Sequence, residues 1–465
     1  MTVFEMPLST NATTIYGMLS VSGIKTASTI GHSLRLSQPT ISRALGELRA
    51  TRPEAFVSFA TKGKTVLYGL RKSIHGLPLS VPVYICEEST PAQIGSLSAL
   101  CAGGFLFEGG PGARYFEGLP WFLRDMVPQG YMGRAFCRAW AEPLGIAGKP
   151  QEWSDEDAFF ILASRGGDAP GNLIIGRANM DGSGNPKGVA TATLASESSL
   201  PAIFDEMARN SVAGEPSGSS AAGEFPKFVT SYQVGELVRN VIVKFSPDGA
   251  DAVATRWRDM LVAEHAALEV LASNEVRRIA SATSRLVRGL NRIYLEVDRF
   301  DRTGEGGRIG VVTMGTIDDE FIGRRASWSA TASSLVVQGM LDDRGAEEIR
   351  FLESFGHYIG NTDMHHGNIS FYCPDNPGTT VKPILELAPV YDMLPMLYAP
   401  ERGEIVTRSL ALPQDTDREA ATVALQYWDS VAGRKDISEG FRAIAHANAS
   451  MVSDTLRRQR PLRPF

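Results

Sequence analysis

The sequence is poor in cysteine and has no long apolar run, and these two absences exclude broad classes of protein. Its 465 residues include only four cysteines, which lie far apart without a C-x-x-C pair, so neither a disulfide framework nor a zinc site is indicated. No apolar stretch approaches the roughly 18 residues that a membrane-spanning helix needs. The first 14 residues contain no Lys or Arg, so the charged start of a secretory signal is missing as well. We therefore expect a cytoplasmic protein without a membrane partner.

The charge of the chain is unevenly distributed. The composition is that of an ordinary globular protein, 43% hydrophobic and 21% charged. A net charge of −6 argues against a protein wholly devoted to nucleic acid. However, residues 1–75 hold nine Lys and Arg against three Asp and Glu, a balance of +6 that leaves −12 for the remainder. A basic module on an acidic body predicts two separate tasks.

The basic segment has the pattern of a small helical module followed by a hairpin. Apolar residues at helical spacing predict three short helices before residue 50, and Ser37 and Pro39 stand at the start of the third. Two strands are predicted at residues 56–59 and 66–70. Polar and basic side chains that could reach bases and phosphates lie on the outer face of the third helix and at the hairpin tip, namely Gln38, Thr40, Ser42, Arg43, Lys62 and Lys64.

Residues 34–48 resemble winged helix-turn-helix DNA-binding domains, in which the third helix enters the major groove and the wing touches the backbone. The inner face of this helix is an apolar stripe of Ile41, Ala44, Leu45 and Leu48. A three-helix module with a structural or dimerisation role is the alternative. Because the polar face of the third helix and the basic wing both fit, we interpret residues 1–75 as a winged helix-turn-helix domain whose partner is duplex DNA.

Two segments after residue 210 suggest the binding of a nucleotide. A lysine, Lys244, interrupts the apolar strand predicted at residues 240–245, and Glu264 in the helix predicted next is a candidate partner. Such a pair would leave the ammonium to bind nucleotide phosphates, as in kinases, whereas a strand-edge lysine pointing to solvent is the alternative. A loop of small residues, which is equally compatible with a flexible linker, could close backbone N–H groups over phosphates; it comprises Gly218, Ser219, Ser220, Ala221, Ala222 and Gly223.

The sharpest signal is the segment 360–370. Asp363 and Asn368 are five residues apart, the spacing by which a kinase catalytic loop places a base for the substrate hydroxyl and a magnesium ligand. Asp363, His365 and His366 could instead ligate zinc or iron, but such a site would usually draw on further His or Cys residues.

A second metal-binding position is predicted further along the chain. Asp392 follows a short apolar strand and takes the place of the second metal-binding aspartate of kinases. A capping or turn aspartate is the alternative. These features occur along the chain in the order that a two-lobed kinase requires: the small-residue loop, the strand lysine, the helix glutamate, the Asp–Asn pair and the later aspartate.

Three motifs resemble the HipA family of toxin kinases: NTDMHHGN at 361–368, APVYDML at 388–394 and LEVDRFDR at 295–302. The N-terminal winged helix on the same chain is similar to the YjjJ branch of that family. The resemblance implies a serine/threonine kinase that uses ATP and Mg²⁺ and arrests growth. In relatives, the targets of this kinase include aminoacyl-tRNA synthetases. The resemblance is also compatible with a separate antitoxin and with a homodimer.

The resemblance also assigns roles to individual residues. It makes Asp363 the catalytic base, with His365 near the phosphates, and Asn368 and Asp392 the magnesium ligands. Lys244 becomes the phosphate clamp. Asp298 to Phe300 become the adenine-facing hinge, and Ser219 and Ser220 fall where family kinases phosphorylate themselves. Relatives often have a basic residue where this chain has Gly367.

Together these patterns predict an α+β, two-lobed protein-kinase-like fold of the HipA type, preceded by a small winged helix-turn-helix domain. We expect that domain at 1–75, an N-terminal lobe with the Gly-rich loop and strand lysine at 76–305, and a mainly helical catalytic lobe at 306–465. Two other functions stay open. One is a DNA-binding transcriptional regulator whose kinase fold senses a ligand, and the other is a DNA nuclease. All five positions that a kinase needs carry residues able to do the chemistry, which favours an active kinase.

Overall fold

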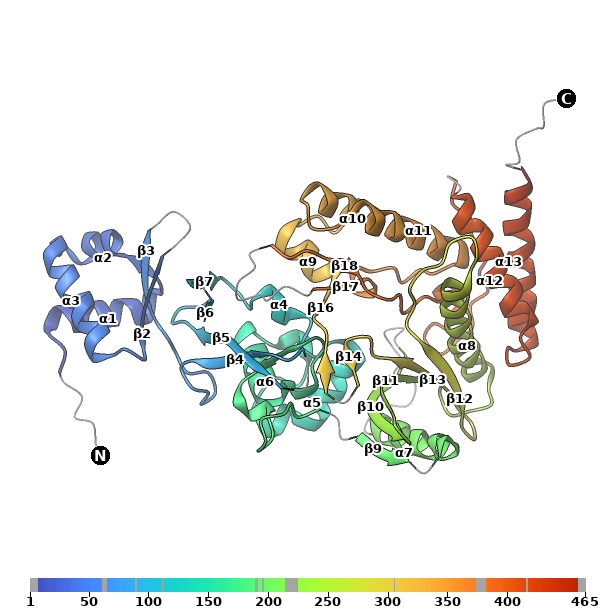
Figure 1. Ribbon diagram of the computed structural model, residues 1–465, viewed down its shortest axis with the longest axis horizontal. Helices are drawn as coiled ribbons and strands as arrows, with labels where there is room; N and C mark the ends of the chain where they lie inside the picture. The colour runs from blue at the N-terminus through green and yellow to red at the C-terminus, as the bar shows by residue number, and fades with distance from the viewer. Residues whose placement is uncertain are drawn as a thin grey trace. The chain divides into compact units, whose positions relative to one another are not determined.

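The chain folds into two compact units, each described here by itself (Figure 1). The first unit is drawn from residues 1–127 and 151–188, and the second from 128–150, 189–374 and 382–465. The computed structural model describes residues 7–60, 65–87, 90–110, 112–188, 191–194, 196–213, 225–304, 306–373, 382–414 and 417–458. The domain borders at 75 and 305 remain predictions.

Three helices and a hairpin open the first unit, in the order that the apolar periodicity predicts. They are α1 (Thr10–Ser22), α2 (Ala27–Leu34), α3 (Gln38–Thr51), β2 (Phe56–Ala60) and β3 (Val66–Leu70). The short β1 (Lys25–Thr26) pairs with the other edge of β3. Ser37 occupies the N-cap position of α3, and the predicted stripe Ile41, Ala44, Leu45 and Leu48 is buried against α1 and α2.

An antiparallel sheet forms the rest of the first unit. Its strand order is β7-β6-β5-β4-β8. The strands are β4 (Val81–Ile85), β5 (Ala92–Ala99), β6 (Phe105–Gly109), β7 (Gly112–Phe116) and β8 (Leu173–Ile175), with α4 (Trp121–Arg124) and α6 (Asp155–Arg165) beside them. Phe105 of the sheet meets Phe159 of α6 edge to face, with ring centroids 5.5 Å apart.

The hairpin β2–β3 shares a core with this sheet. Val57 and Phe59 on β2 are buried against Leu100 and Leu106. Arg71, just after β3, donates hydrogen bonds to Ser98 Oγ at 3.1 Å and to Glu108 Oε2 at 2.5 Å. The inner side of the hairpin is therefore part of a continuous apolar cluster.

A five-stranded sheet opens the second unit, with strand order β12-β13-β11-β10-β9. It is antiparallel except for the β9–β10 pair. The strands are β9 (Thr191–Leu194), β10 (Lys227–Val234), β11 (Leu237–Phe245), β12 (Ser284–Arg288) and β13 (Ile293–Asp298). Helix α7 (Leu200–Val212) covers one face through Phe204, and α5 (Gly130–Leu144) lies near β10. Helix α8 (Ala252–Ser273) packs beside β12 and β13 (Figure 1).

The remainder of the second unit is mainly helical. Its helices are α9 (Met314–Phe321), α10 (Trp328–Val337), α11 (Asp343–Ile359), α12 (Arg418–Gly433) and α13 (Glu439–Arg458). Its strands are the pair β14 (Arg302–Thr303) and β15 (Gly307–Arg308), and the small sheet β16 (Val311–Thr313), β17 (Ser370–Tyr372) and β18 (Glu386–Leu387). Large aromatic side chains, among them Trp328, Tyr358 and Trp428, are fully buried there. A sheet-rich part followed by a helical part is the predicted two-lobed arrangement.

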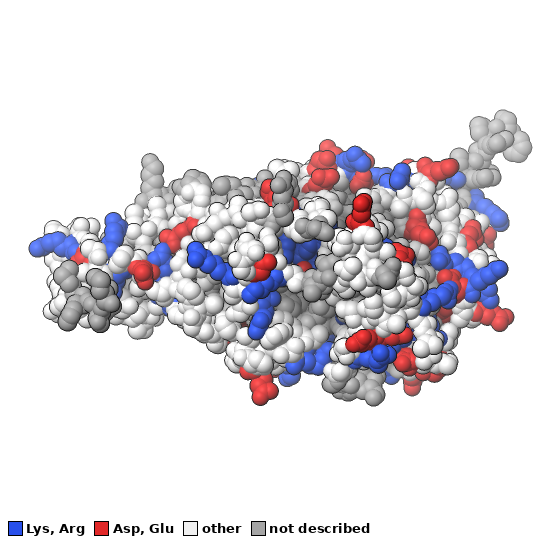
Figure 2. Space-filling view, turned by 60° about the horizontal axis from the view of Figure 1, so that its bottom comes forward, with Lys and Arg blue, Asp and Glu red and all other residues white. Residues whose placement is uncertain are grey.

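The surface and the helix lengths bear on the charge and membrane expectations. On the face shown in Figure 2, acidic and basic side chains are interspersed rather than gathered into one large field of a single sign. None of the helices in the described part of the chain is both long enough and apolar enough to cross a bilayer.

Candidate active site

The strand lysine lies between two carboxylates. Alternation along β11 turns Val241, Val243 and Phe245 toward α7, so Lys244 points to the opposite face of the sheet, where α8 runs. Its Nζ lies 2.5 Å from Glu264 Oε1 on α8 and also contacts Asp392 Oδ1. Lys244 is 6% exposed and Glu264 is completely buried. The structure thus brings together three residues that the sequence singled out.

The charges in this cluster stabilise one another. Burial lowers the pKa of Lys244, but the charges of Asp392 and Glu264 outweigh it and raise the pKa above its ordinary value. Burial likewise raises the pKa of Asp392, whereas Lys244 and then Lys227 lower it, with a net decrease. At neutral pH the site therefore holds a cationic Lys244 and an anionic Asp392.

Lys227 is a candidate site residue that the sequence reasoning missed. It opens β10 and stands directly opposite Lys244 in the antiparallel register. Like charges in directly opposed positions repel each other, so two lysines here need anions, and Glu264 and Asp392 supply two. A bound phosphate would supply more. The signal in the sequence was a lysine at the first position of a strand that follows a small-residue loop.

The predicted catalytic loop begins where α11 ends. Gly360 has a φ of +74°, the left-handed conformation that stops the helix. Asn361 Oδ1 accepts from the Asp363 N–H at 3.0 Å, and Asn368 Nδ2 donates to the Asp363 carbonyl at 2.8 Å. The five-residue spacing thus closes the loop on itself, and it leaves the amide oxygen of Asn368 as the atom that could bind a cation.

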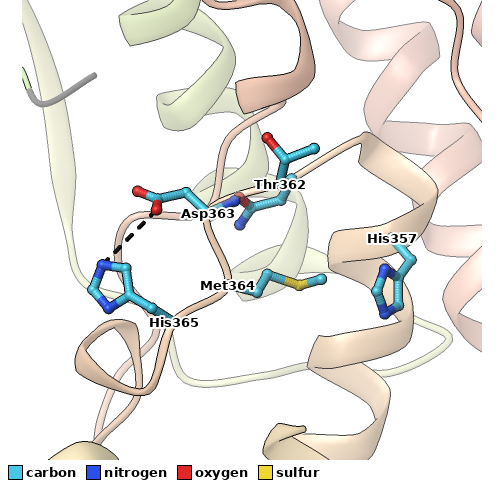
Figure 3. A pocket seen from close by; sticks show the side chains of 6 residues that line it. His357, Thr362, Asp363, Met364 and His365 are labelled. Carbon is cyan, nitrogen blue, oxygen red and sulfur yellow. Dashed lines mark hydrogen bonds and ion pairs between the residues drawn. The ribbon is translucent and has the colours of Figure 1, made fainter. Parts of the chain in front are cut away.

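Asp363 stands at the edge of an open pocket. Its side chain is 53% exposed and lies 4.0 Å from His365 Nε2. Figure 3 shows these two side chains on one side of the loop, while Met364 points toward His357. The pocket has a volume of about 520 Å³ and is lined by His357, Asn361, Thr362, Asp363, Met364 and His365. This volume is in the range of small-molecule and peptide sites.

Asp392 is joined to the loop on both sides. The Tyr391 hydroxyl donates to the Gly367 carbonyl at 2.7 Å, and Asn361 Nδ2 lies 3.6 Å from Met393 Sδ. A smaller electrostatic contribution from His365 also lowers the pKa of Asp392. Asp392 itself has a φ of +53°, an uncommon conformation for a residue other than glycine and one that often marks functional sites.

The predicted hinge lies at the end of β13. Arg239 donates to Asp298 Oδ1 from Nε at 3.1 Å and from Nη2 at 2.6 Å, so the Asp298 carboxylate is held by the sheet. The Phe300 ring lies 5.7 Å from the Tyr391 ring, next to Asp392.

Oxygen ligands suited to magnesium are present, whereas a histidine-rich metal site is not formed. His366 is buried and bonds Thr331 on α10 rather than joining Asp363 and His365. Within the described ranges, no three His, Cys, Asp or Glu side chains are grouped so that they could hold a metal ion. Asp392 and Asn368 offer a carboxylate and an amide oxygen, the donors that Mg²⁺ prefers. Glu264 Oε2 beside them is buried without a hydrogen-bond partner among the residues described.

The predicted DNA-contacting residues are only partly visible. Gln38, Ser42 and Arg43 are exposed on the outer face of α3. Thr40 is half-buried, with its hydroxyl 2.9 Å from Ser37 Oγ. Two sets of predicted residues lie outside the described part of the chain: Lys62 and Lys64 of the wing, and the loop residues Gly218, Ser219, Ser220, Ala221, Ala222 and Gly223.

Comparisons with known proteins identify relatives over nearly the whole chain. Two family models match, a YjjJ-like toxin middle domain over residues 77–182 and a HipA-like C-terminal domain over residues 219–456. Toxin YjjJ of Escherichia coli strain K12 is 32% identical over 441 residues, which cover 92% of this chain and 94% of that protein.

Solved structures support the fold. HipA of Shewanella oneidensis MR-1, in a complex with HipB and operator DNA, aligns with a TM-score of 0.51 and 15% identity over 81% of this chain and 97% of that one. This match confirms the predicted HipA-type fold. The kinase CtkA of Helicobacter pylori aligns with a TM-score of 0.35 and 13% identity over 50% of this chain and 91% of that one, which is too distant to bear on the fold.

Proposed function

Because the chain belongs to the HipA-like toxin family, in its YjjJ branch, we propose that it is a serine/threonine protein kinase that uses ATP and Mg²⁺ and arrests growth by phosphorylating a cellular protein. The observation that carries this proposal is the buried Lys244, held between Glu264 and Asp392 and joined through Asp392 to the loop of Asp363 and Asn368. By resemblance to the family, an aminoacyl-tRNA synthetase is the candidate substrate.

The site residues divide the work of phosphoryl transfer. An ammonium has three N–H donors, and in Lys244 two of them meet Glu264 and Asp392, so a third can meet a phosphate oxygen. Lys227 adds a second positive charge on the same face. Asn368 and Asp392 would hold Mg²⁺, which neutralises charge on the phosphates when bound.

Asp363 would act on the other reactant. Its exposed carboxylate faces the open pocket, where a serine or threonine hydroxyl can approach and give up its proton. Positioning and electrostatic stabilisation supply nearly all of the catalysis in such reactions, and these few groups would supply both. Ser219 and Ser220 are candidates for autophosphorylation by the same site.

DNA binding is a second function that a separate observation favours. Gln38, Ser42 and Arg43 project from one exposed face of α3 and make few contacts within the chain. Side chains of this kind read base edges in the major groove. The HipA relative was solved with HipB and operator DNA, so we also propose an antitoxin as a partner. A homodimer would match a two-fold operator.

The kinase proposal is tested by incubating the purified protein with labelled ATP and Mg²⁺ and mapping the phosphorylated residues. The parent should label serine or threonine, and Asp363→Ala should lower labelling by about a hundredfold or more. Asp454→Ala, which changes an exposed aspartate on α13, is the matched control and should label like the parent.

Other outcomes identify the alternatives. A parent that binds ATP without transferring phosphate would support a ligand-sensing regulator instead. Cleavage of duplex DNA with Mg²⁺ and no ATP would support a nuclease. Labelling by Asp363→Ala at the parental rate would refute the role of Asp363.

A further inference from the structure

The catalytic loop holds its reacting groups in exposed positions, and the course of the loop backbone sets where they lie. Asp363 and His365 have side chains that are 53% and 60% exposed. A displacement of about 1 Å can cost about a hundredfold in rate. The contacts of the intervening residues with α9 and α10 identify what holds the loop.

His366 is the buried residue in the middle of the loop. Its Nε2 lies 3.0 Å from the Thr331 hydroxyl on α10 and 3.7 Å from Asp318 Oδ2 on α9. Thr331 and Asp318 are 1% and 0% exposed. A side chain of the loop thus enters the interior formed by two helices that contribute no reacting group.

Thr331 links His366 to Asp318. The Thr331 hydroxyl lies 3.3 Å from Asp318 Oδ2, to which it can donate, because a carboxylate only accepts. The same hydroxyl is within hydrogen-bond distance of His366 Nε2. The three buried side chains therefore form one continuous polar cluster.

Asp318 is itself fixed by the backbone. Its carboxylate accepts from the N–H of Arg324 and of Arg325, each at 3.0 Å, in the turn that follows α9. A buried carboxylate needs such donors, since a charge without them is costly in the interior. The carboxylate of Asp318 is therefore held by the backbone of this turn.

A second contact holds the neighbouring residue of the loop. Trp328, at the start of α10, donates from Nε1 to the His365 carbonyl at 3.2 Å. Its own N–H donates to Glu353 Oε1 on α11 at 3.0 Å. The start of α10 is therefore bonded both to the loop and to the helix that leads into it, and consecutive loop residues are fastened to α10.

We propose that Asp318, Thr331 and His366 are positioning residues that orient the catalytic loop for phosphoryl transfer. The inference rests on the proposed kinase function. None of the three touches the nucleotide-binding lysines or the open pocket, so they act only through Asp363 and Asn368, which lie three residues before and two residues after His366. Losing the contact should lower the rate of transfer and leave the binding of ATP nearly unchanged.

The test replaces Thr331 with valine, which keeps the shape and removes the hydroxyl. We expect kcat to fall about tenfold to a hundredfold, with KM for ATP within about twofold of the parent, and Thr331→Ser to restore the parental kcat. Thr422→Val is the matched control, because the Thr422 hydroxyl bonds only the Arg418 carbonyl of its own helix, α12. It should change neither constant.

Hydrogen exchange gives a readout that is independent of catalysis. The backbone amides of residues 361–369 should exchange faster in Thr331→Val and in His366→Ala than in the parent. In Thr422→Val they should exchange at the parental rate. Parental kcat together with parental exchange in Thr331→Val would overturn the positioning role, and so would an equal loss in Thr331→Ser. A parent that transfers no phosphate would instead overturn the proposed function, and exchange alone would then decide whether Thr331 fixes the loop.

Discussion

Replacing Lys244 with methionine tests whether the buried charge cluster stabilises the second unit. Methionine keeps the unbranched apolar stem and removes the ammonium. Glu264, completely buried, then loses its cationic partner while its carboxylate stays out of water. Removing one member of a buried ion pair costs about 3–5 kcal/mol, and the partly exposed Asp392 adds less because water screens it. We expect the free energy of unfolding to fall by about 3–5 kcal/mol at neutral pH.

The pH dependence of this loss follows from Glu264. Burial raises the pKa of Glu264 above its ordinary value of 4.5, and Lys244 opposes that rise. Without Lys244 the folded-state pKa rises further. A raised carboxyl pKa contributes stability that is present below the unfolded-state value and lost as pH rises through the folded-state value. The free energy of unfolding that Lys244→Met loses relative to the parent should therefore be smallest near pH 4.5 and should grow as the pH rises.

The assay is urea unfolding at several pH values, with tryptophan fluorescence as the signal that reports unfolding. Trp257, Trp328 and Trp428 are buried in the second unit and report on it. Adding Glu264→Gln to Lys244→Met removes the stranded charge and should recover most of the lost stability, because deleting both partners is far less costly than deleting one. An unchanged unfolding curve at alkaline pH, or a loss that does not vary with pH, would refute the reasoning.

Two further predictions concern growth and DNA. Asp392→Ala should relieve the growth arrest caused by overexpression, because a lost metal ligand removes charge neutralisation at the phosphates; colony counts after induction measure this, and equal arrest by parent and variant would contradict it. Arg43→Ala in the full chain should weaken discrimination between a preferred and a scrambled operator by about tenfold to a hundredfold, the worth of one bidentate base contact. Gel shifts at fixed salt measure the ratio of the affinities for the two operators. An unchanged ratio in Arg43→Ala would exclude base reading by Arg43.

Much of the site could be predicted from local sequence. The spacing of Asp363 and Asn368 is a property of one loop, and the hydrogen bond between Asn368 Nδ2 and the Asp363 carbonyl shows why that spacing is needed. Lys244 stood out because a charge within an apolar strand requires partners. The helix α3 followed from apolar periodicity, since it buries one face.

What the sequence could not provide depends on contacts between distant segments. Lys227 meets Lys244 through strand register, which no local pattern specifies. Asp318, Thr331 and His366 come from two helices and a loop, and no local pattern predicts that they meet. In the first unit, β8 pairs with β4 although many residues separate the two strands, so the sheet β4–β8 has no local sequence signature.

The apolar core that the hairpin β2–β3 shares with the sheet β4–β8 has a mechanical consequence. Val57 and Phe59 face Leu100 and Leu106, and Arg71 clamps the exit of the hairpin to Ser98 and Glu108. A fragment cut at residue 75 would expose that apolar surface to water and would tend to aggregate. A force applied to the hairpin would be transmitted into the sheet β4–β8 through this shared core.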